Sequence, residues 1–204
     1  RKGSDMNTKE KIVWEALKLF STRGYGAVSV RDIAAAVGIR ESSLYNHFPN
    51  KRAIFDGIVD ICWAKAEEYY HSHGLPFSSK DDLSVFQGGG QELEETVLEV
   101  FRFFFEDPWN TRFRRLLTVC QFDDSRSGEL YRRLYCQYPV EVQEKIFTGL
   151  MERGIFRTGD PRVLAEQFYG GVFLLLSAGE SWEEVRPKIT AQVRQFTGDH
   201  KTYK

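Results

Sequence analysis

Cysteine is scarce in this sequence and long hydrophobic runs are missing, and both deficits narrow the class of protein. The 204 residues include three cysteines, Cys62, Cys120 and Cys136, an odd number at wide spacing. This pattern argues against a disulfide framework or a zinc site and is typical of a reducing compartment. The longest nearly unbroken apolar run, residues 170–179, is well short of the roughly 20 residues that a membrane span needs. We expect a cytoplasmic protein that does not enter a membrane.

Catalytic and metal-binding motifs are missing as well. His71 and His73 stand two residues apart, so they would not share a helix face, and no carboxylate or cysteine stands at a metal-ligand spacing from them. The glycine run 88–90 lacks the strand and helix that flank a nucleotide-binding loop, and no nucleophile elbow occurs. The sequence therefore predicts neither an enzyme nor a protein with a metal or cofactor.

Apolar and aromatic residues are plentiful by contrast, at 42% and 14% of the chain. This content is enough for a sizeable core and argues against global disorder. Apolar positions recur at helical spacing along the chain, whereas no segment alternates between apolar and polar residues as a half-buried strand does. The fold class predicted by this periodicity is all-α.

The net charge of −1 conceals an uneven distribution along the chain. Residues 1–52 contain ten Lys and Arg against five Asp and Glu, whereas the remainder contains 18 against 24. A basic front and an acidic back suggest that only the front meets a polyanion such as DNA.

The front of the chain has helix start and stop signals in regular order. Small polar residues that can cap a helix stand at Thr8, Ser29 and Asn50. Residues that end a helix stand at Gly24, Gly38 and the pair Phe48-Pro49. The helices expected from these signals cover residues 8–23, 30–37, about 41–47 and 51–70.

The second and third of these helices, joined by a tight glycine turn, form a helix-turn-helix. With Leu44 and Phe48 pointing inward, the third helix turns a polar face outward. A helix in the major groove presents short hydrogen-bonding side chains to base edges and longer ones to the phosphates on either side. We assign base contacts to Ser42, Ser43 and Asn46. We assign phosphate contacts to Tyr45 and His47, and either role to Arg40.

The start of the fourth helix adds a separate argument for DNA. Lys51 and Arg52 follow the cap Asn50, although cations at a helix N-terminus oppose the macrodipole by typically about 0.3–1 kcal/mol each. Their position makes sense if a phosphate binds there, where backbone N–H groups also point outward. Ser29 and Arg31 repeat the pattern more weakly at the start of the second helix. Lys51, Ser29 and Arg31 therefore join the predicted DNA contacts.

Residues 8–55, above all SVRDIAAAVGIRESSLYNHFPNKRAIF, resemble the N-terminal domain of the tetracycline-repressor (TetR) family of bacterial regulators. The shared features are the Ile-Ala pair of the second helix, the Val-Gly-Ile turn, the Leu-Tyr-x-His-Phe of the third helix and the Asn-Lys that starts the fourth. The resemblance covers about a quarter of the chain. One departure is Arg40, where the family more often has a serine that caps the third helix, so Ser42 is an alternative start.

The resemblance implies an all-helical homodimer with a DNA-reading head and a larger domain that binds an inducer. It implies that Tyr45, His47 and Lys51 touch phosphate. On this basis we expect a helix-turn-helix DNA-binding domain over residues 6–52. Residues 53–204 are expected to form the ligand-binding and dimerisation domain.

The back of the chain has the composition of a sensor for small molecules. Residues 71–90 form either a loop between two domains or an irregular flap over the second. Further helices are expected near 91–106, 109–122, 127–154 (broken or bent at Pro139), 161–178 and 182–197. Large aromatic side chains favour a hydrophobic or aromatic effector over a sugar or metal. The candidate ligand contacts are Phe105, Trp109, Phe113, Tyr138 and Phe168.

The last two helices each carry an apolar stripe. One stripe consists of Phe168, Gly171, Val172 and Leu175, and the other of Trp182, Val185, Ile189, Val193 and Phe196. Two such helices from each subunit would form a four-helix bundle, which predicts a homodimer through this pair. The alternative is that both stripes face their own domain. Pro187 either kinks or splits the final helix.

The function that fits these features is a DNA-binding transcriptional regulator. A homodimer would read a palindromic operator, and a small effector would release it, so that repression is the default state. The alternative is a helical ligand-binding or scaffold protein whose helix-turn-helix has only a structural role.

Overall fold

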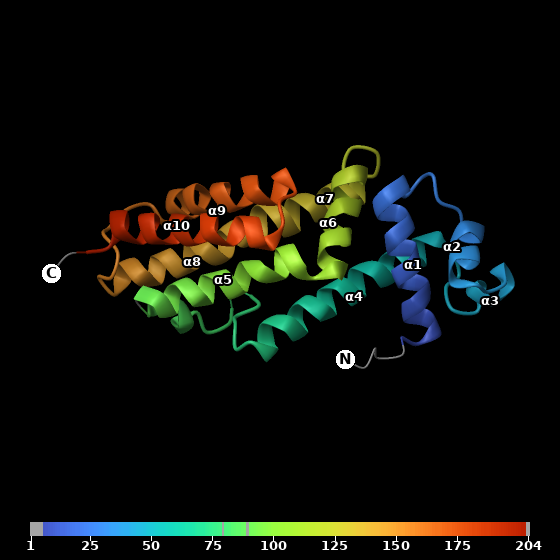
Figure 1. Cartoon of the computed structure of the whole chain (residues 1–204), viewed down its shortest axis with the longest axis horizontal. Coiled ribbons are helices and arrows are strands. Elements are labelled where there is room, and N and C mark those ends of the chain that lie inside the picture. The colour runs from blue at the N-terminus through green and yellow to red at the C-terminus, as the bar shows by residue number, and fades with distance from the viewer. Residues whose placement is uncertain (1–5, 79, 89, 203–204) are drawn as a thin grey trace. The chain divides into compact units, whose positions relative to one another are not determined.

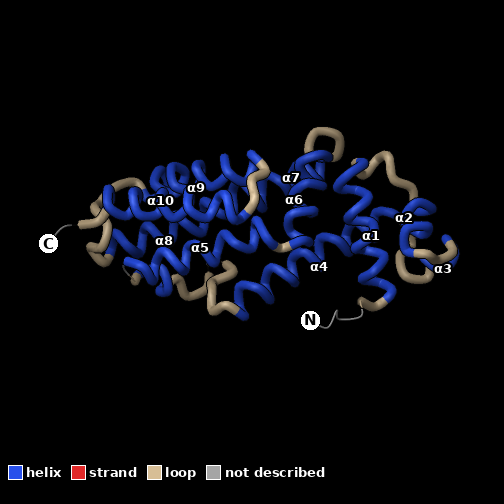
Figure 2. Tube along the Cα trace, in the orientation of Figure 1, coloured by secondary structure: helices blue, strands red, loops and turns tan. Residues whose placement is uncertain are grey.

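The computed structural model describes residues 6–78, 80–88 and 90–202, and it confirms the predicted all-α fold. Figure 2 shows helices joined by loops, with no strand in this part of the chain. Figure 1 labels the α-helices. The helices are α1 (Thr8–Arg23), α2 (Val30–Val37), α3 (Glu41–Tyr45), α4 (Lys51–Ser72), η1 (Ser84–Gln87), α5 (Gly90–Glu106), α6 (Pro108–Cys120), α7 (Ser125–Arg132), η2 (Arg133–Gln137), α8 (Tyr138–Glu152), α9 (Pro161–Ala178) and α10 (Trp182–His200). Among the described residues, none of these helices combines the length and hydrophobicity that crossing a bilayer requires.

Contacts within the chain divide it into two compact units. The head unit contains the residues up to Lys65 and Pro108–Tyr131, and the body unit contains Ala66–Asp107 and Arg132–Lys204. The head unit therefore includes α6 and most of α7 besides the three N-terminal helices. The predicted boundary between residues 52 and 53 separates a DNA-binding domain from a ligand-binding and dimerisation domain. This division by function stays a prediction.

The first two helices begin and end close to the expected residues, with one correction. Asn7, not Thr8, caps α1: its side chain accepts from the Glu10 amide, while the Glu10 carboxylate accepts from the Asn7 amide. Asparagine is among the best N-caps, and the carboxylate three residues later completes a capping box. Ser29 caps α2 as predicted.

Helix α6 packs along α1 and closes the core of the head unit. The Trp14 and Trp109 rings lie 4.7 Å apart between their centroids. The buried side chains of α1 and α6 that fill this core are Ile12, Val13, Ala16, Leu17, Phe20, Trp109, Phe113, Leu116, Leu117 and Cys120. The head is thus more than a three-helix domain, because its first helix is covered by a segment about a hundred residues later.

The core of the body unit lies between α5, α8, α9 and α10, and it contains the stripes that the sequence pattern assigns to a dimer interface. Val185 and Ile189 are fully buried there with Val172 and Phe168. The assignment of these stripes to a dimer interface is therefore wrong. A helical period shows which residues share a face, but here that face is covered by the unit's own helices.

The structure answers three open questions about the body unit, which concern two prolines and the irregular segment 71–90. Pro187 does not split α10, which continues through it. The expected helix over 127–154 is interrupted before Pro139 by the π-helical segment η2, where an extra residue per turn accommodates the break in the hydrogen-bond ladder. The segment 71–90 belongs to the body unit, where Leu75 and Phe86 are buried.

Candidate nucleic-acid interface

The turn between α2 and α3 depends on Gly38. This residue has φ +81°, in the left-handed region that glycine adopts without strain. Its amide and that of Ile39 both donate to the Ala34 carbonyl, at 3.0 Å each. The Gly38 amide also donates to the Ala35 carbonyl at 3.2 Å. This bond and the one from Ile39 to Ala34 cap α2 as a Schellman motif and direct the chain into α3.

Helix α3 begins at Glu41, and the alternative start at Ser42 is wrong. Arg40 occupies the N-cap position with no side-chain cap, although its carbonyl accepts from the amides of Ser43 and Leu44. The helix ends at Tyr45, two residues before the predicted end. The amides of His47 and Phe48 then bond to the Leu44 carbonyl and continue the turn.

Two apolar side chains hold α3 against the head unit, as the helical wheel predicts. Leu44 is fully buried and Phe48 is 4% exposed. The Phe48 ring packs so close to Gly57 of α4 that a Cβ built there would meet it at 3.1 Å. The missing Cβ of Gly57 therefore allows the Phe48 ring to pack closely on α4.

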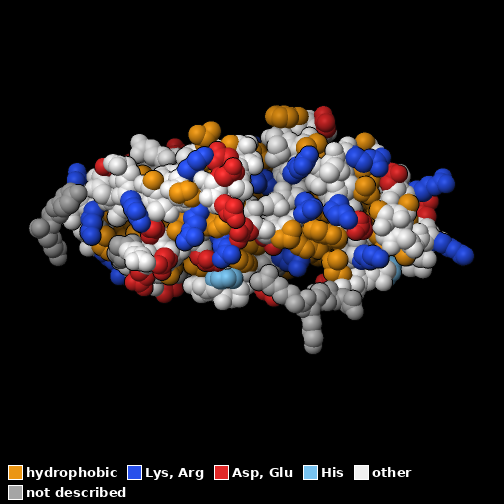
Figure 3. Space-filling view, viewed as in Figure 1, with side chains coloured by type: hydrophobic (Ala, Val, Ile, Leu, Met, Phe, Trp, Pro, Cys, Tyr) orange, Lys and Arg blue, Asp and Glu red, His pale blue; other side chains and the backbone are white. Residues whose placement is uncertain are grey.

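The opposite side of α3, together with the residues directly before and after the helix, is open. Arg40, Ser42, Asn46 and His47 are exposed, Ser43 is half-buried and Tyr45 is 46% exposed. None of these side chains, nor that of Arg31, forms a hydrogen bond or ion pair within the described part of the chain. Figure 3 shows Lys and Arg side chains projecting over α2 and α3. These donors and acceptors are available to an external partner.

Two other predicted DNA contacts are occupied within the protein. The Ser29 hydroxyl donates to Asp32 Oδ2 at 2.7 Å, and its oxygen accepts from the Asp32 amide. Hydrogen bonds from the backbone amide and side chain of Ser29 lower the pKa of Asp32 below its ordinary value. Lys51 Nζ donates to the carbonyls of Tyr25 and Val28, at 2.8 and 2.9 Å.

Arg52, the second cation at the start of α4, is also paired. Its guanidinium lies 3.8 Å from Asp56 Oδ1 and 3.7 Å from Asp124 Oδ1, and it stacks over the Phe55 ring. Arg126 of α7 contacts the same Asp56 oxygen at 2.5 Å. This network ties α7 to α4 within the head unit, and nothing in the sequence pattern predicted it.

The five candidate ligand contacts are divided between the two units. Trp109 and Phe113 belong to the core of the head unit. Phe168 lies in the core of the body unit, the Tyr138 hydroxyl donates to the Phe77 carbonyl at 2.9 Å, and Phe105 packs on Trp182. Within neither unit do all five meet. A hollow of about 290 Å³ in the body unit is lined by other residues, namely His71, Gly74, Leu75, Pro76, Asp81 and Asp82.

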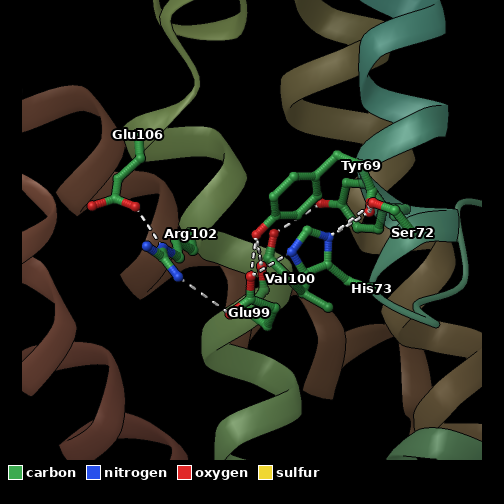
Figure 4. Close-up of polar contacts among 8 residues, drawn as sticks. Tyr69, Ser72, His73, Glu99, Val100, Arg102 and Glu106 are labelled. Atoms are coloured by element: carbon green, nitrogen blue, oxygen red, sulfur yellow. Dashed lines mark hydrogen bonds and ion pairs between the residues drawn. The ribbon is translucent and has the colours of Figure 1, made fainter. Parts of the chain in front are cut away.

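A polar cluster that the sequence did not predict joins the end of α4 to α5 in the body unit (Figure 4). The Tyr69 hydroxyl donates to Glu99 Oε1 at 2.5 Å, and burial together with this carboxylate raises the pKa of Tyr69. His73 stacks on the Tyr69 ring and lies 3.5 Å from the same carboxylate. Arg102 extends the cluster from Glu99 to Glu106. Residues thirty positions apart carry no local signal of such a contact.

Residues 12–58 match the family model of bacterial regulatory proteins of the tetR family. This segment is a TetR-family domain. It comprises α2, α3, most of α1 and the first residues of α4. Members of the TetR family are transcriptional regulators and not enzymes.

Relatives in sequence match part of the chain. The biofilm operon icaADBC HTH-type negative transcriptional regulator IcaR of Staphylococcus aureus is 42% identical over 77 residues. The match covers 38% of this chain and 39% of IcaR, so it extends over well under half of either protein. The resemblance to IcaR therefore concerns only part of this chain.

Solved structures extend the likeness of fold to nearly the whole chain. A TetR-family transcriptional regulator from Mesorhizobium loti has a TM-score of 0.67 at 16% identity, with 98% of this chain and all of that chain covered. AibR, solved in complex with isovaleryl coenzyme A and operator DNA, has a TM-score of 0.59 at 20% identity, with 90% and 96% covered. At these identities the likeness shows the fold alone.

Proposed function

We propose that this protein is a transcriptional repressor that reads operator DNA through α3 and is released by a small-molecule effector. The observation that carries the proposal is the open polar side of α3. Leu44 and Phe48 fasten the other side of the helix to the head unit, while the outward side chains have no partner in the described chain.

The proposed roles follow from length and chemistry. Ser42, Ser43 and Asn46 are short enough to meet base edges in the major groove, where hydroxyl and amide groups read sequence. Tyr45 and His47 flank them and reach the phosphates, as does Arg31 from α2. Arg40, at the start of α3, contacts a base or a phosphate.

The operator is read by two copies of the chain, with half-sites about 34–36 Å or a multiple of this apart. Since the predicted stripes are internal, we assign the dimer contact to the outward side of α9. Leu174 is 68% exposed and Val163 is 43% exposed. Gly170, on the same side, has no atom within 4 Å of a built Cβ, which leaves room for a close approach.

The effector binds the body unit, and we keep the expectation of a hydrophobic or aromatic small molecule. Phe105, Tyr138 and Phe168 are the candidates that belong to this unit. Support for an effector comes from AibR, a protein of the same fold solved with isovaleryl coenzyme A and operator DNA. Binding shifts the population of dimer arrangements away from the one that fits the operator.

The experiment is selection of bound fragments from the source genome, followed by titration of the selected duplex at increasing salt. If the protein makes six to ten phosphate contacts, raising the salt from 50 to 200 mM should lower its affinity for the duplex about 10³–10⁵-fold. Loss of the Tyr45 hydroxyl in Tyr45→Phe should weaken binding about three- to tenfold, the worth of one hydrogen bond. Weak, salt-insensitive binding to every sequence, unchanged by Tyr45→Phe, would favour the scaffold alternative.

A further inference from the structure

Lys51, the first residue of α4, turns its ammonium group into the head unit. Its Nζ donates to the carbonyl of Tyr25 at 2.8 Å and to that of Val28 at 2.9 Å. The same atom lies 4.3 Å from the centroid of the Tyr25 ring. An ammonium has three donors and no acceptor, so two are used by carbonyls and the remaining side faces an aromatic ring.

The two carbonyls belong to the connection between α1 and α2, residues 24–29. This connection has no helical ladder of its own, so its buried polar groups need partners from elsewhere. Val28 is buried, and its carbonyl directly precedes Ser29, the N-cap of α2. Lys51 therefore links the start of α4 to the residue that precedes the N-cap of α2.

Tyr25 fastens the same connection at a second point. Its ring packs edge-on against Phe20 of α1 and Phe55 of α4, with centroids 5.1 and 5.5 Å away. Its amide donates to Cys120 Sγ of α6 at 3.4 Å. The connection is thus held between α4 and α6, and α2, which follows it, sets the orientation of α3.

We propose that Lys51 is a positioning residue for DNA binding: it fixes the α1–α2 connection, and through it α2 and α3, instead of binding phosphate. This inference rests on the proposed function, and it differs from the role that resemblance to the TetR family implies for this lysine. An ammonium that moved out to a phosphate would leave two carbonyls without their donor. Burial of the side chain lowers the pKa of Lys51, in keeping with this inward placement.

The test compares Lys51→Met, which keeps the aliphatic stem and removes the donors, with Arg40→Met, which removes an exposed cation. The probe is a mixed-sequence duplex of about 30 base pairs, long enough for two half-sites. Titration between 50 and 200 mM salt gives the slope of log Kobs against log salt, which changes by about 0.9 for each phosphate that the protein ceases to neutralise.

For Lys51→Met we expect the same slope of log Kobs against log salt as for the wild-type protein, with weaker binding across the whole salt range. If the variant holds the binding arrangement about a tenth of the time, Kd rises about tenfold. For Arg40→Met we expect a shallower slope. A slope reduced by about 0.9 per subunit in Lys51→Met would overturn the proposal.

Two further measurements keep the test decisive. Amide hydrogen exchange of residues 24–29 in the DNA-free protein should be faster in Lys51→Met than in wild type and unchanged in Arg40→Met; equal protection in all three would overturn the proposal. Lys51→Arg keeps the charge, but a planar fork replaces the compact ammonium. If it restores affinity without restoring protection of residues 24–29, Lys51 is a phosphate ligand and the proposal fails.

Failure of this inference and failure of the proposed function give different results in these measurements. A wild-type protein that does not bind the duplex at 50 mM salt would contradict the proposed function, whereas the exchange measurement, made without DNA, still decides whether Lys51 holds the connection.

Discussion

Helix α3 of the head unit and helices α9 and α10 of the body unit are all amphipathic, but their exposed sides differ in kind. In the head unit, α3 has a two-residue apolar anchor and an outward side of hydroxyl, amide and imidazole groups. In the body unit, the regular apolar stripe of α10 faces inward, and among the described residues the exposed large apolar side chains, Val163 and Leu174, belong to α9. Hence the polar side of α3 is open to a partner as the helical wheel predicts, whereas the apolar side of α10 is covered by its own unit.

The largest effect is expected at Leu44, which anchors α3 to the rest of the head unit. Leu44→Ala removes a fully buried side chain and should destabilise the head unit by about 2–5 kcal/mol, because a cavity is left beside Phe48. DNA binding should be lost with it. Tyr45→Ala, on the open side of the same helix, should change stability by less than about 0.5 kcal/mol. Thermal unfolding followed by circular dichroism measures both, and equal losses would place Tyr45 in the core.

The inward stripe of α10 gives the corresponding test in the body unit. Ile189→Ala should destabilise the body unit by about 2–5 kcal/mol and leave the protein dimeric, because Ile189 is fully buried within its own chain. Leu174→Arg on α9 should leave the body unit folded and shift the dimer towards monomer. Sedimentation equilibrium separates the two effects. A monomeric but stable Ile189→Ala variant would restore the stripe as a dimer interface.

Gly57 provides a smaller effect that tests the contact between α3 and α4. A Cβ at this position would meet the Phe48 ring at 3.1 Å and Val13 at 3.3 Å, so Gly57→Ala should cost about 1–3 kcal/mol through overpacking. The control is Gly149→Ala in α8, where the nearest atom is at 3.8 Å. That change should stabilise the protein by about 0.5–1 kcal/mol, since alanine favours the helix. Equal denaturant midpoints for the two variants would contradict the close packing.

The smallest effect concerns the cap of α2. Ser29→Ala should destabilise the protein by about 1 kcal/mol at neutral pH. Because the folded-state pKa of Asp32 is lowered, its contribution is present at neutral pH and is lost as pH falls through that pKa. The difference between variant and wild type should therefore shrink in acid. Thr118→Ala, which removes a bond to a carbonyl one turn back on α6, is the control and should show no such pH dependence.

Local signals explain why the head was predicted well. The Ser29–Asp32 capping box, the left-handed Gly38 and the Asn50 cap each depend on residues within four positions of one another. The same holds for the inward placement of Leu44 and Phe48, which follows from one helical turn. The Thr8 cap was wrong by one residue because asparagine and threonine stand side by side there.

Long-range contacts explain what the sequence could not show. Lys51 bonds to carbonyls more than twenty residues earlier, and Tyr69 pairs with Glu99 thirty residues later. Composition predicts Trp109 and Phe113 as ligand contacts, but it could not show that they pack between α6 and α1. Which side chains meet depends on how helices pack, and helical periodicity carries no information about that.

By itself the sequence determined the helices, their caps and the polar composition of α3, because hydrogen bonding within a turn and the spacing of apolar residues are local properties. Only the tertiary structure decided which donors remain free. It turned Lys51 inward, towards the carbonyls of Tyr25 and Val28, and left Ser42, Tyr45 and Asn46 open. The reason is that the carbonyls of a loop must find donors wherever the folded chain brings them.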